Sequence, residues 1–171
     1  LFKDFLRYLQ DHTSAGEHAI TANEGLAVAL ASGRYLSTGQ VPLIYLQNSG
    51  LGNIVTPLTS LADKEMFAIP MLLLIGWRGR PGVKDEPQHK KMGRITLPLL
   101  DTLEVPYYLL EPDETVSLEK IEKALQRAGE ISAPVALVVP EGIFEKYQGR
   151  EETENYTLIR EEVIKAIINA L

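Results

Sequence analysis

Glu24 is the single carboxylate in a stretch of small and aliphatic residues, TANEGLAVALASG at 21–33. The alanines and glycines of this stretch let neighbouring backbones come close, so the sequence predicts a helix packed tightly against another segment. An acid in the first turn is favoured by the helix macrodipole, which is one interpretation of Glu24. A helix packed this tightly has little room for a charge, so the other interpretation is that Glu24 has a function, which the rest of the chain must decide.

A second candidate is the turn QNSGLGN at 47–53, which leads from an apolar strand pattern into a helical one. Gly50 and Gly52 let a ligand approach the backbone, and the N–H groups at a helix start attract an anion or a polar ring. The turn contains neither the GxxxxGK[ST] nor the GxGxxG phosphate-binding pattern. It is either a ligand cradle or a tight connection.

The third candidate is the stretch 78–94, which concentrates positive charge. It holds six basic and two acidic residues, a net charge of +4, whereas the whole chain carries −6. Arginine and lysine neutralise phosphonate or sulfonate oxygens, so this stretch either captures a multiply charged anion or is a solvated charged loop. His89 lies among these cations as a candidate for proton transfer. His12 and His18 lack such a setting and are interpreted as structural.

Other chemistries find no support in the sequence. There is no cysteine, the three histidines are isolated from one another, and no GxSxG nucleophile motif is present. Ser49 has no evident His–Asp partnership. Thiolate catalysis, a protein metal site and serine-hydrolase chemistry are therefore not expected, which leaves an organic cofactor or none.

The composition is that of one globular domain, expected to span 1–171. The net charge of −6 argues against nucleic acid as a partner. The longest apolar run, 69–77, is far too short to span a bilayer and no signal peptide opens the chain, so a soluble, cytoplasmic protein is expected. Both termini lie inside helical patterns, which suggests an excised domain or a chain lacking its disordered ends.

Apolar strand patterns alternate with helical ones along the chain. Continuous apolar strands are typical of a parallel sheet covered by helices on both faces, so the predicted fold class is a doubly wound α/β domain with a mainly parallel sheet. Ligands of such sheets bind at the carboxyl ends of the strands, where we expect the three candidate segments to meet. The expected strands are 41–47, 71–77, 105–110, 134–140 and, more weakly, 18–22, and the expected helices are 23–38, 51–66, 92–103, 115–129 and 159–171.

Together with their spacing, the strings ANEG, QNSGLGN, TSLAD, GWRG and VKDEPQH resemble the phosphonopyruvate decarboxylases, a family of thiamine-diphosphate-dependent enzymes. The resemblance covers at least residues 20–110. In this superfamily the active site lies between two α/β domains, one holding the aminopyrimidine ring of the cofactor and the other holding its diphosphate and Mg²⁺ through a GDG…N motif. This chain resembles the pyrimidine-binding domain and contains no GDG. The resemblance therefore implies thiamine diphosphate and Mg²⁺ as cofactors, a second domain as partner, and a homo-oligomer.

By the same resemblance, Glu24 is the carboxylate that hydrogen-bonds the pyrimidine N1′. It thereby promotes deprotonation of the thiazolium C2 by the cofactor's own 4′-amino group. The 47–53 turn resembles the one that cradles the pyrimidine and thiazolium edges. The residues implied to bind cofactor are Glu24, Gln47, Asn48, Ser49, Gly50 and Asn53, and none is implied to bind metal.

The 78–91 loop resembles the substrate-side loop of the family. Arg78 and Lys84 would then receive the phosphonate or the carboxylate of the substrate. Gln88 and His89 would lie near the reacting carbon, and His89 would assist protonation after CO₂ leaves. Glu24 and His89 are the two implied catalytic residues.

The implied activity is conversion of 3-phosphonopyruvate to phosphonoacetaldehyde and CO₂, a lyase step of phosphonate biosynthesis. One alternative is the α subunit of a sulfopyruvate decarboxylase, which shares the mechanism. The other is a non-catalytic α/β module that binds an anion, against which the carboxylate at Glu24 argues. Family members generally begin with a strand and a GVPDS-like turn, and this chain starts at or after that point. Part of the substrate pocket is therefore expected to be absent, and the isolated chain is expected to bind cofactor poorly and to be inactive.

Overall fold

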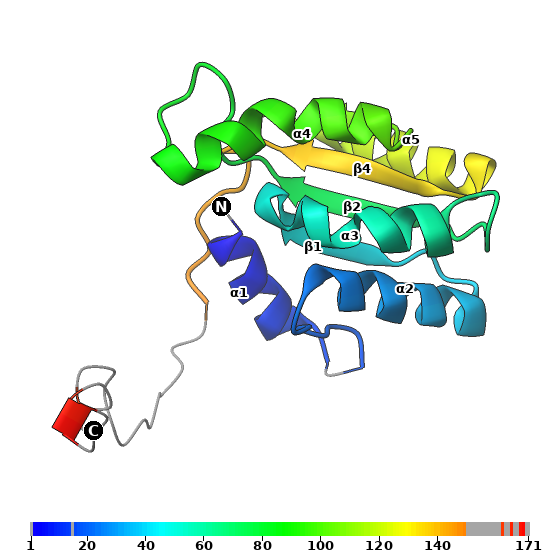
Figure 1. Cartoon of the computed structure of the whole chain (residues 1–171), viewed down its shortest axis with the longest axis horizontal. Helices are drawn as coiled ribbons and strands as arrows, with labels where there is room; N and C mark the ends of the chain where they lie inside the picture. The colour runs from blue at the N-terminus through cyan, green and yellow to red at the C-terminus, as the bar shows by residue number, and fades with distance from the viewer. Residues whose placement is uncertain (1, 15, 150–161, 163–164, 166–167, 170–171) are drawn as a thin grey trace.

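The computed structural model describes residues 2–14, 16–149, 162, 165, 168 and 169, and shows a parallel sheet flanked by five helices (Figure 1). This arrangement confirms the α/β class and the helices on both faces of the sheet. The helix expected at 159–171 lies almost wholly outside the described residues.

The sheet has four strands in the order β1-β2-β4-β3, all parallel. Every residue of the two central strands, β2 and β4, is buried, which explains why their sequences are continuously apolar. The four stronger strand predictions are confirmed, with β3 shorter than expected. The bounds are β1 Leu43–Gln47, β2 Met71–Gly76, β3 Tyr107–Leu109 and β4 Pro134–Val139.

The weaker strand prediction, 18–22, is wrong. This segment pairs with no strand in the described part of the chain, and its one large apolar side chain, Ile20, is exposed. With a single large apolar side chain, and that one exposed, the segment buries too little surface to hold it in the sheet as a strand.

The direction in which the chain crosses the sheet explains which face each helix covers. The connections from β1 to β2 and from β2 to β3 step the same way across the sheet, so right-handed crossovers place α3 and α4 on one face. The connection from β3 back to β4 places α5 on the other face, where it packs on β4, β2 and β3 (Figure 1). The helices are α1 Lys3–His12, α2 Glu24–Thr38, α3 Leu51–Pro57, α4 Lys90–Thr102 and α5 Glu114–Ile131.

Two of the expected helix bounds need correction. The helix expected at 51–66 is α3 followed by a π-helical turn, η2 (Leu58–Ala62), and it ends there. The carboxylate of Asp63 accepts the backbone N–H of Glu65, and its carbonyl accepts those of Met66 and Ala68, so the chain turns instead of continuing as a helix. The helix expected at 92–103 begins earlier, at Lys90.

The first turn of α2 is capped by its neighbour in the sequence. The side chain of Asn23 accepts the backbone N–H of Leu26 at 2.9 Å, and Gly39 ends the helix in the left-handed conformation. This cap fixes Glu24 as the first helical residue.

Nowhere in the described residues is there a helix with the length and apolar character that a membrane crossing requires.

Candidate functional site

The candidate segments meet beyond the carboxyl ends of β1 and β2. The start of α2 packs against α3, and the turn η1 (Asn48–Gly50) between β1 and α3 contacts the residues that follow β2. The expected convergence is therefore present, although the segment before Glu24 is not a strand. The topology produces it, because neighbouring parallel strands end at the same rim.

Glu24 is half-buried, and one of its two carboxylate oxygens is fixed by the fold. The side-chain amide of Asn53 donates to Oε2 at 2.7 Å. The other oxygen, Oε1, has no hydrogen-bond partner among the described residues. The result is an oriented carboxylate with one oxygen available to a ligand.

Gly50 makes room for this carboxylate. A Cβ at position 50 would overlap the carboxylate and Cγ of Glu24, so a side chain fits there only if Glu24 moves. Gly25 lies close to the same contact, since a Cβ there would come within 3.1 Å of the carbonyl oxygen of Asn53. The close approach of α2 and α3 predicted from small residues is therefore real, and it is tightest around Glu24.

Asn48 is fully buried and all its polar groups are engaged within the chain. Its Nδ2 donates to the carbonyl of Arg78 and to Oγ1 of Thr96, both at 2.9 Å, and its Oδ1 accepts the backbone N–H of Arg78 at 3.2 Å. Asn48 thus ties the end of β1 to the end of β2 and to α4. The geometry gives it a framework role, and its predicted contact with cofactor stays a prediction.

The other predicted members of the turn lie at its surface. Ser49 is exposed and its hydroxyl donates to Oε1 of Gln47 at 3.1 Å, while Gln47 is half-buried. Asn53 is exposed beside Glu24. These three side chains remain accessible to a ligand near the carboxylate.

Arg78 is occupied by an acidic partner that the sequence analysis did not single out. Its guanidinium donates to both carboxylate oxygens of Asp85, at 2.9 and 2.6 Å. The backbone N–H groups of Gly79 and Glu86 donate to the same carboxylate at 2.6 and 2.7 Å. This Arg78 guanidinium, with the two amides, holds the pKa of Asp85 well below its usual range, and Asp85 in turn raises the pKa of Arg78.

A second cation of the loop is also held by the fold. The guanidinium of Arg80 lies 5.4 Å from the centre of the buried Trp77 ring, and the Trp77 indole N–H donates to the carbonyl of Gly93 at 2.8 Å. Four basic residues of the stretch are exposed and form no ion pair within the part of the chain that the structure describes: Lys84, Lys90, Lys91 and Arg94.

Gln88 and His89 sit where the loop enters α4. They belong to the short 3₁₀ turn η3 (Pro87–His89), in which Gln88 is exposed and His89 is half-buried. The backbone N–H of His89 donates to the carbonyl of Glu86 at 3.0 Å. No hydrogen bond or ion pair joins Glu24 to the 78–91 loop among the described residues, so the roles of Lys84, Gln88 and His89 stay predictions.

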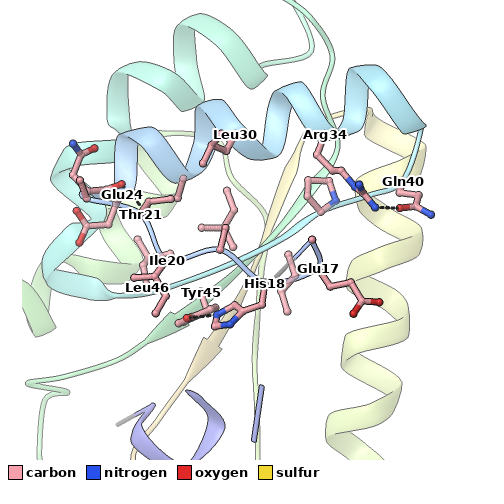
Figure 2. Close-up of a pocket in the computed structure, with 18 of the residues that line it drawn as sticks. Glu17, His18, Ile20, Thr21, Glu24, Leu30, Arg34, Gln40, Tyr45 and Leu46 are labelled. Carbon is pink, nitrogen blue, oxygen red and sulfur yellow. Dashed lines mark hydrogen bonds between the residues drawn. The ribbon is translucent and has the colours of Figure 1, made fainter. Parts of the chain in front are cut away.

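A groove of about 730 Å³ runs from Glu24 along the free edge of β1. It is lined by the 16–24 segment, by α2 and by β1, with Glu24 at one end and the hydrogen-bonded Arg34 and Gln40 at the other (Figure 2). His18 hydrogen-bonds the hydroxyl of Tyr45 at 2.8 Å across this groove, and His12 lies 2.8 Å from the carbonyl of Tyr8. Both histidines thus have local partners, in line with the structural roles expected for them.

The described residues contain no group of three His, Cys, Asp or Glu side chains that could hold a metal ion. The arrangement as a whole is a carboxylate fixed on one side, beside a glycine turn and a folded basic loop.

No protein-family model matches the chain. Individual curated proteins do. The phosphonopyruvate decarboxylase of Streptomyces viridochromogenes is 40% identical over 130 residues, which cover 75% of this chain and 32% of that protein. The chain thus spans about a third of the length of that relative, and the same holds for a second phosphonopyruvate decarboxylase, from Streptomyces hygroscopicus, at 37% identity.

A different kind of relative is matched over most of its length. Sulfopyruvate decarboxylase subunit alpha of Methanococcus maripaludis is 33% identical over 138 residues, which cover 80% of this chain and 78% of that subunit. The subunit of the same name from Methanocaldococcus jannaschii is 35% identical over 138 residues, or 77% of its length.

Proposed function

Because the chain belongs to the thiamine-diphosphate-dependent family of phosphonopyruvate and sulfopyruvate decarboxylases, we propose that it is the pyrimidine-binding part of such an enzyme. The observation that carries this proposal is the Glu24 carboxylate, which has Oε2 held by Asn53 and Oε1 without a partner. A module that only binds an anion would have no use for an acid oriented in this way.

The residues around Glu24 fit an aminopyrimidine ring. Oε1 can accept a hydrogen bond from a protonated ring nitrogen or, when protonated, donate one. Because Gly50 has no side chain, the Glu24 carboxylate can occupy the space next to it. The exposed Ser49 and Asn53 offer hydroxyl and amide groups to the edge of a heterocycle. Glu24 therefore holds and exchanges a proton with the ring, while Asn53 keeps the carboxylate aimed.

Bound thiamine diphosphate would supply a nucleophilic thiazolium carbon and the electron sink that loss of CO₂ requires. The chain's own part in the reaction is to orient the ring, to move the proton at Oε1 and to bind the anionic substrate. Lys84 is one of the four exposed basic residues that form no ion pair among the described residues, and we assign it the distal anionic group of the substrate. Gln88 and His89 follow it in the η3 turn, and we propose that they lie near the reacting carbon.

For the substrate, we place sulfopyruvate first. The match to α subunits of sulfopyruvate decarboxylase runs through 78% and 77% of their length and 80% of this chain. Phosphonopyruvate is the second candidate, favoured by the higher identity of 40%. Sulfonate and phosphonate are both recognised by lysine and arginine, so substrate assays must distinguish the two acids.

The partner we propose is a second thiamine-diphosphate-binding domain, the β subunit that the name of the α subunits implies. That domain would supply the diphosphate and Mg²⁺ ligands, for which the described residues contain no metal-binding cluster. The outward side of α2 is the surface that we assign to this contact, because Leu26 and Leu30 are exposed in the two turns that follow Glu24, and Leu36 is exposed further along the helix.

The test is CO₂ release from sulfopyruvate and from phosphonopyruvate by the complete enzyme, assembled with its second domain, thiamine diphosphate and Mg²⁺. Glu24→Gln keeps the size and polarity of the side chain but removes its proton exchange. We expect turnover to fall by about 100-fold or more, the range of a lost general acid–base group.

Glu122→Gln is the matched control, because Glu122 is an exposed glutamate on α5, on the opposite face of the sheet. It should leave turnover unchanged. Full activity of Glu24→Gln would refute the catalytic role of this carboxylate, and a wild-type enzyme inactive on both acids would refute the proposed function.

A further inference from the structure

We propose that Asp85 is a positioning residue for substrate binding: it fixes the shape of the 78–89 loop, keeps Arg78 out of the anion site and leaves Lys84 as the cation that meets the substrate. This inference rests on the proposed function, because it concerns the substrate side of the same site. Neither the charge pattern nor the comparisons assign a role to Asp85.

The first step of the argument is the number of groups that the Asp85 carboxylate holds. It accepts four hydrogen bonds, two from the Arg78 guanidinium and one each from the backbone amides of Gly79 and Glu86. The side chain of Asp85 is only 9% exposed, so water does not replace these donors readily. Charge-assisted bonds of this kind are the strong ones, and here they join both ends of the 78–86 segment.

The second step is that Arg78 is anchored to the sheet as well as to Asp85. Its backbone N–H and carbonyl both bond the buried side chain of Asn48, which also bonds Thr96 of α4. The loop is thus connected, through Arg78, to the ends of β1 and β2 and to α4. Asp85 takes the Nε and Nη2 donors of the guanidinium, so this cation is directed at Asp85 rather than at a substrate anion.

The third step is the packing of the loop on the start of α4. Gly79 has a φ of +67°, and a Cβ there would overlap the carbonyl of His89. A Cβ at Gly93 would in turn overlap the carbonyl of Gly79. Because these backbones touch, the shape of the loop that Asp85 maintains also sets the backbone position of His89.

The basic residues of the loop therefore differ in their contacts, and we propose that they differ in their roles. Arg78 and Arg80 are bound to Asp85 and to the Trp77 ring, respectively. Lys84 is adjacent to Asp85 in the chain and is exposed without an ion pair in the described residues. Loss of Asp85 would release Arg78 and let the loop move, which should weaken substrate binding more than it slows the chemistry.

The test compares Asp85→Asn with Glu86→Gln in the complete enzyme. Both substitutions remove one negative charge from adjacent positions, but the Glu86 carboxylate holds no hydrogen bond among the described residues. For Asp85→Asn we expect the KM for the sulfo- or phosphonopyruvate substrate to rise about tenfold or more, with kcat within about threefold and thiamine diphosphate affinity unchanged. Glu86→Gln should change none of these by more than about twofold.

Amide hydrogen exchange provides a readout that does not depend on turnover. The N–H groups of Gly79 and Glu86 are bonded to Asp85, so both should exchange faster in Asp85→Asn and at the wild-type rate in Glu86→Gln. Unchanged KM and unchanged exchange in Asp85→Asn would overturn the proposal. A rise in KM accompanied by weaker binding of thiamine diphosphate would also overturn it, because that pattern indicates general damage to the fold.

The two proposals fail in different ways. If the wild-type enzyme turns over neither substrate, the proposed function fails, whereas the exchange measurement still decides whether Asp85 fixes the loop.

Discussion

The side chain of Glu24 fills the space that a Cβ at position 50 would need, so the two positions constrain each other. The backbone of Gly50 has an ordinary φ of −83°, and glycine is required by the approach of the carboxylate rather than by the backbone angle. A larger residue would displace the carboxylate from Asn53, and with it the oxygen that is aimed at the ligand.

Gly50→Ala tests this constraint, with Gly52→Ala as its control. Alanine at Gly50 would displace the flexible Glu24 side chain rather than backbone, so it should cost about 1 kcal/mol or less of unfolding free energy but lower turnover of the complete enzyme at least about tenfold. Gly52 is exposed within α3 and a Cβ there meets nothing within 4 Å, so alanine should stabilise by about 0.5–1 kcal/mol. Denaturant unfolding and CO₂ release measure the two effects, and equal behaviour of the two variants would contradict the argument.

The lowered pKa of Asp85 predicts how the stability of the protein changes at acid pH. The Arg78 guanidinium and two backbone amides lower this pKa in the folded state, whereas the unfolded value is about 3.9. A lowered folded-state pKa gives stability that is present above the unfolded pKa and lost as the pH falls through the folded one. Arg78 stays protonated throughout, and the negative charges of Glu86 and Glu141 also favour its charged form.

We therefore expect the stability difference between wild type and Asp85→Asn to be constant from pH 7 to about 5 and to shrink below about pH 4. Urea unfolding at a series of pH values measures it, with Glu86→Gln included as the control for the loss of a nearby charge. A difference that grows as the pH falls would show that the carboxylate is not held in its ionised form.

Among the elements, α2 has two unlike sides. One side buries Val28, Ala31 and Ser32 toward the sheet and α3, which the small residues of its sequence predict. The other side exposes Leu26, Leu30 and Leu36. An apolar strip next to the proposed catalytic carboxylate is typical of a surface that another domain covers.

Leu30→Glu should therefore prevent assembly of the complete enzyme, since it places a charge in the centre of that strip. Leu118→Glu is a closely matched control: Leu118 and Leu30 are both 52% exposed, and Leu118 lies on α5 on the opposite face of the sheet. Sedimentation or light scattering of the two variants measures assembly. Normal assembly of Leu30→Glu would exclude this side of α2 as the contact.

The elements also show what periodicity can and cannot predict. The central strands and α5 were predictable because continuous apolar runs and a long amphipathic pattern each have one structural solution. The end of the helix after α3 could not be predicted, because the apolar spacing continues to Met66. Asp63 accepts hydrogen bonds from the backbone N–H groups that would otherwise extend the helix. At 18–22 the composition suggested a strand. A strand also needs another strand to pair with, and the sequence of the segment alone does not show whether one is available.

For the molecule as a whole, the topology was the most useful prediction about the site. It placed the turn after β1 and the loop after β2 at one rim, where Asn48 bonds Arg78. The sequence could not show that Asp85 pairs with Arg78. The 78–94 stretch has six basic and two acidic residues, and only its folded conformation determines which of them meet. The sequence likewise could not show that Asn53 binds Oε2 of Glu24, which leaves Oε1 without a hydrogen-bond partner among the described residues.

Among the described residues, β1 pairs with β2 alone, so one edge of this strand presents its N–H and C=O groups to the groove of Figure 2. An open strand edge is a template for any extended peptide, and charged side chains on the rest of the surface do not protect it. An extended segment that entered this groove could therefore bond these N–H and C=O groups and continue the sheet beyond β1.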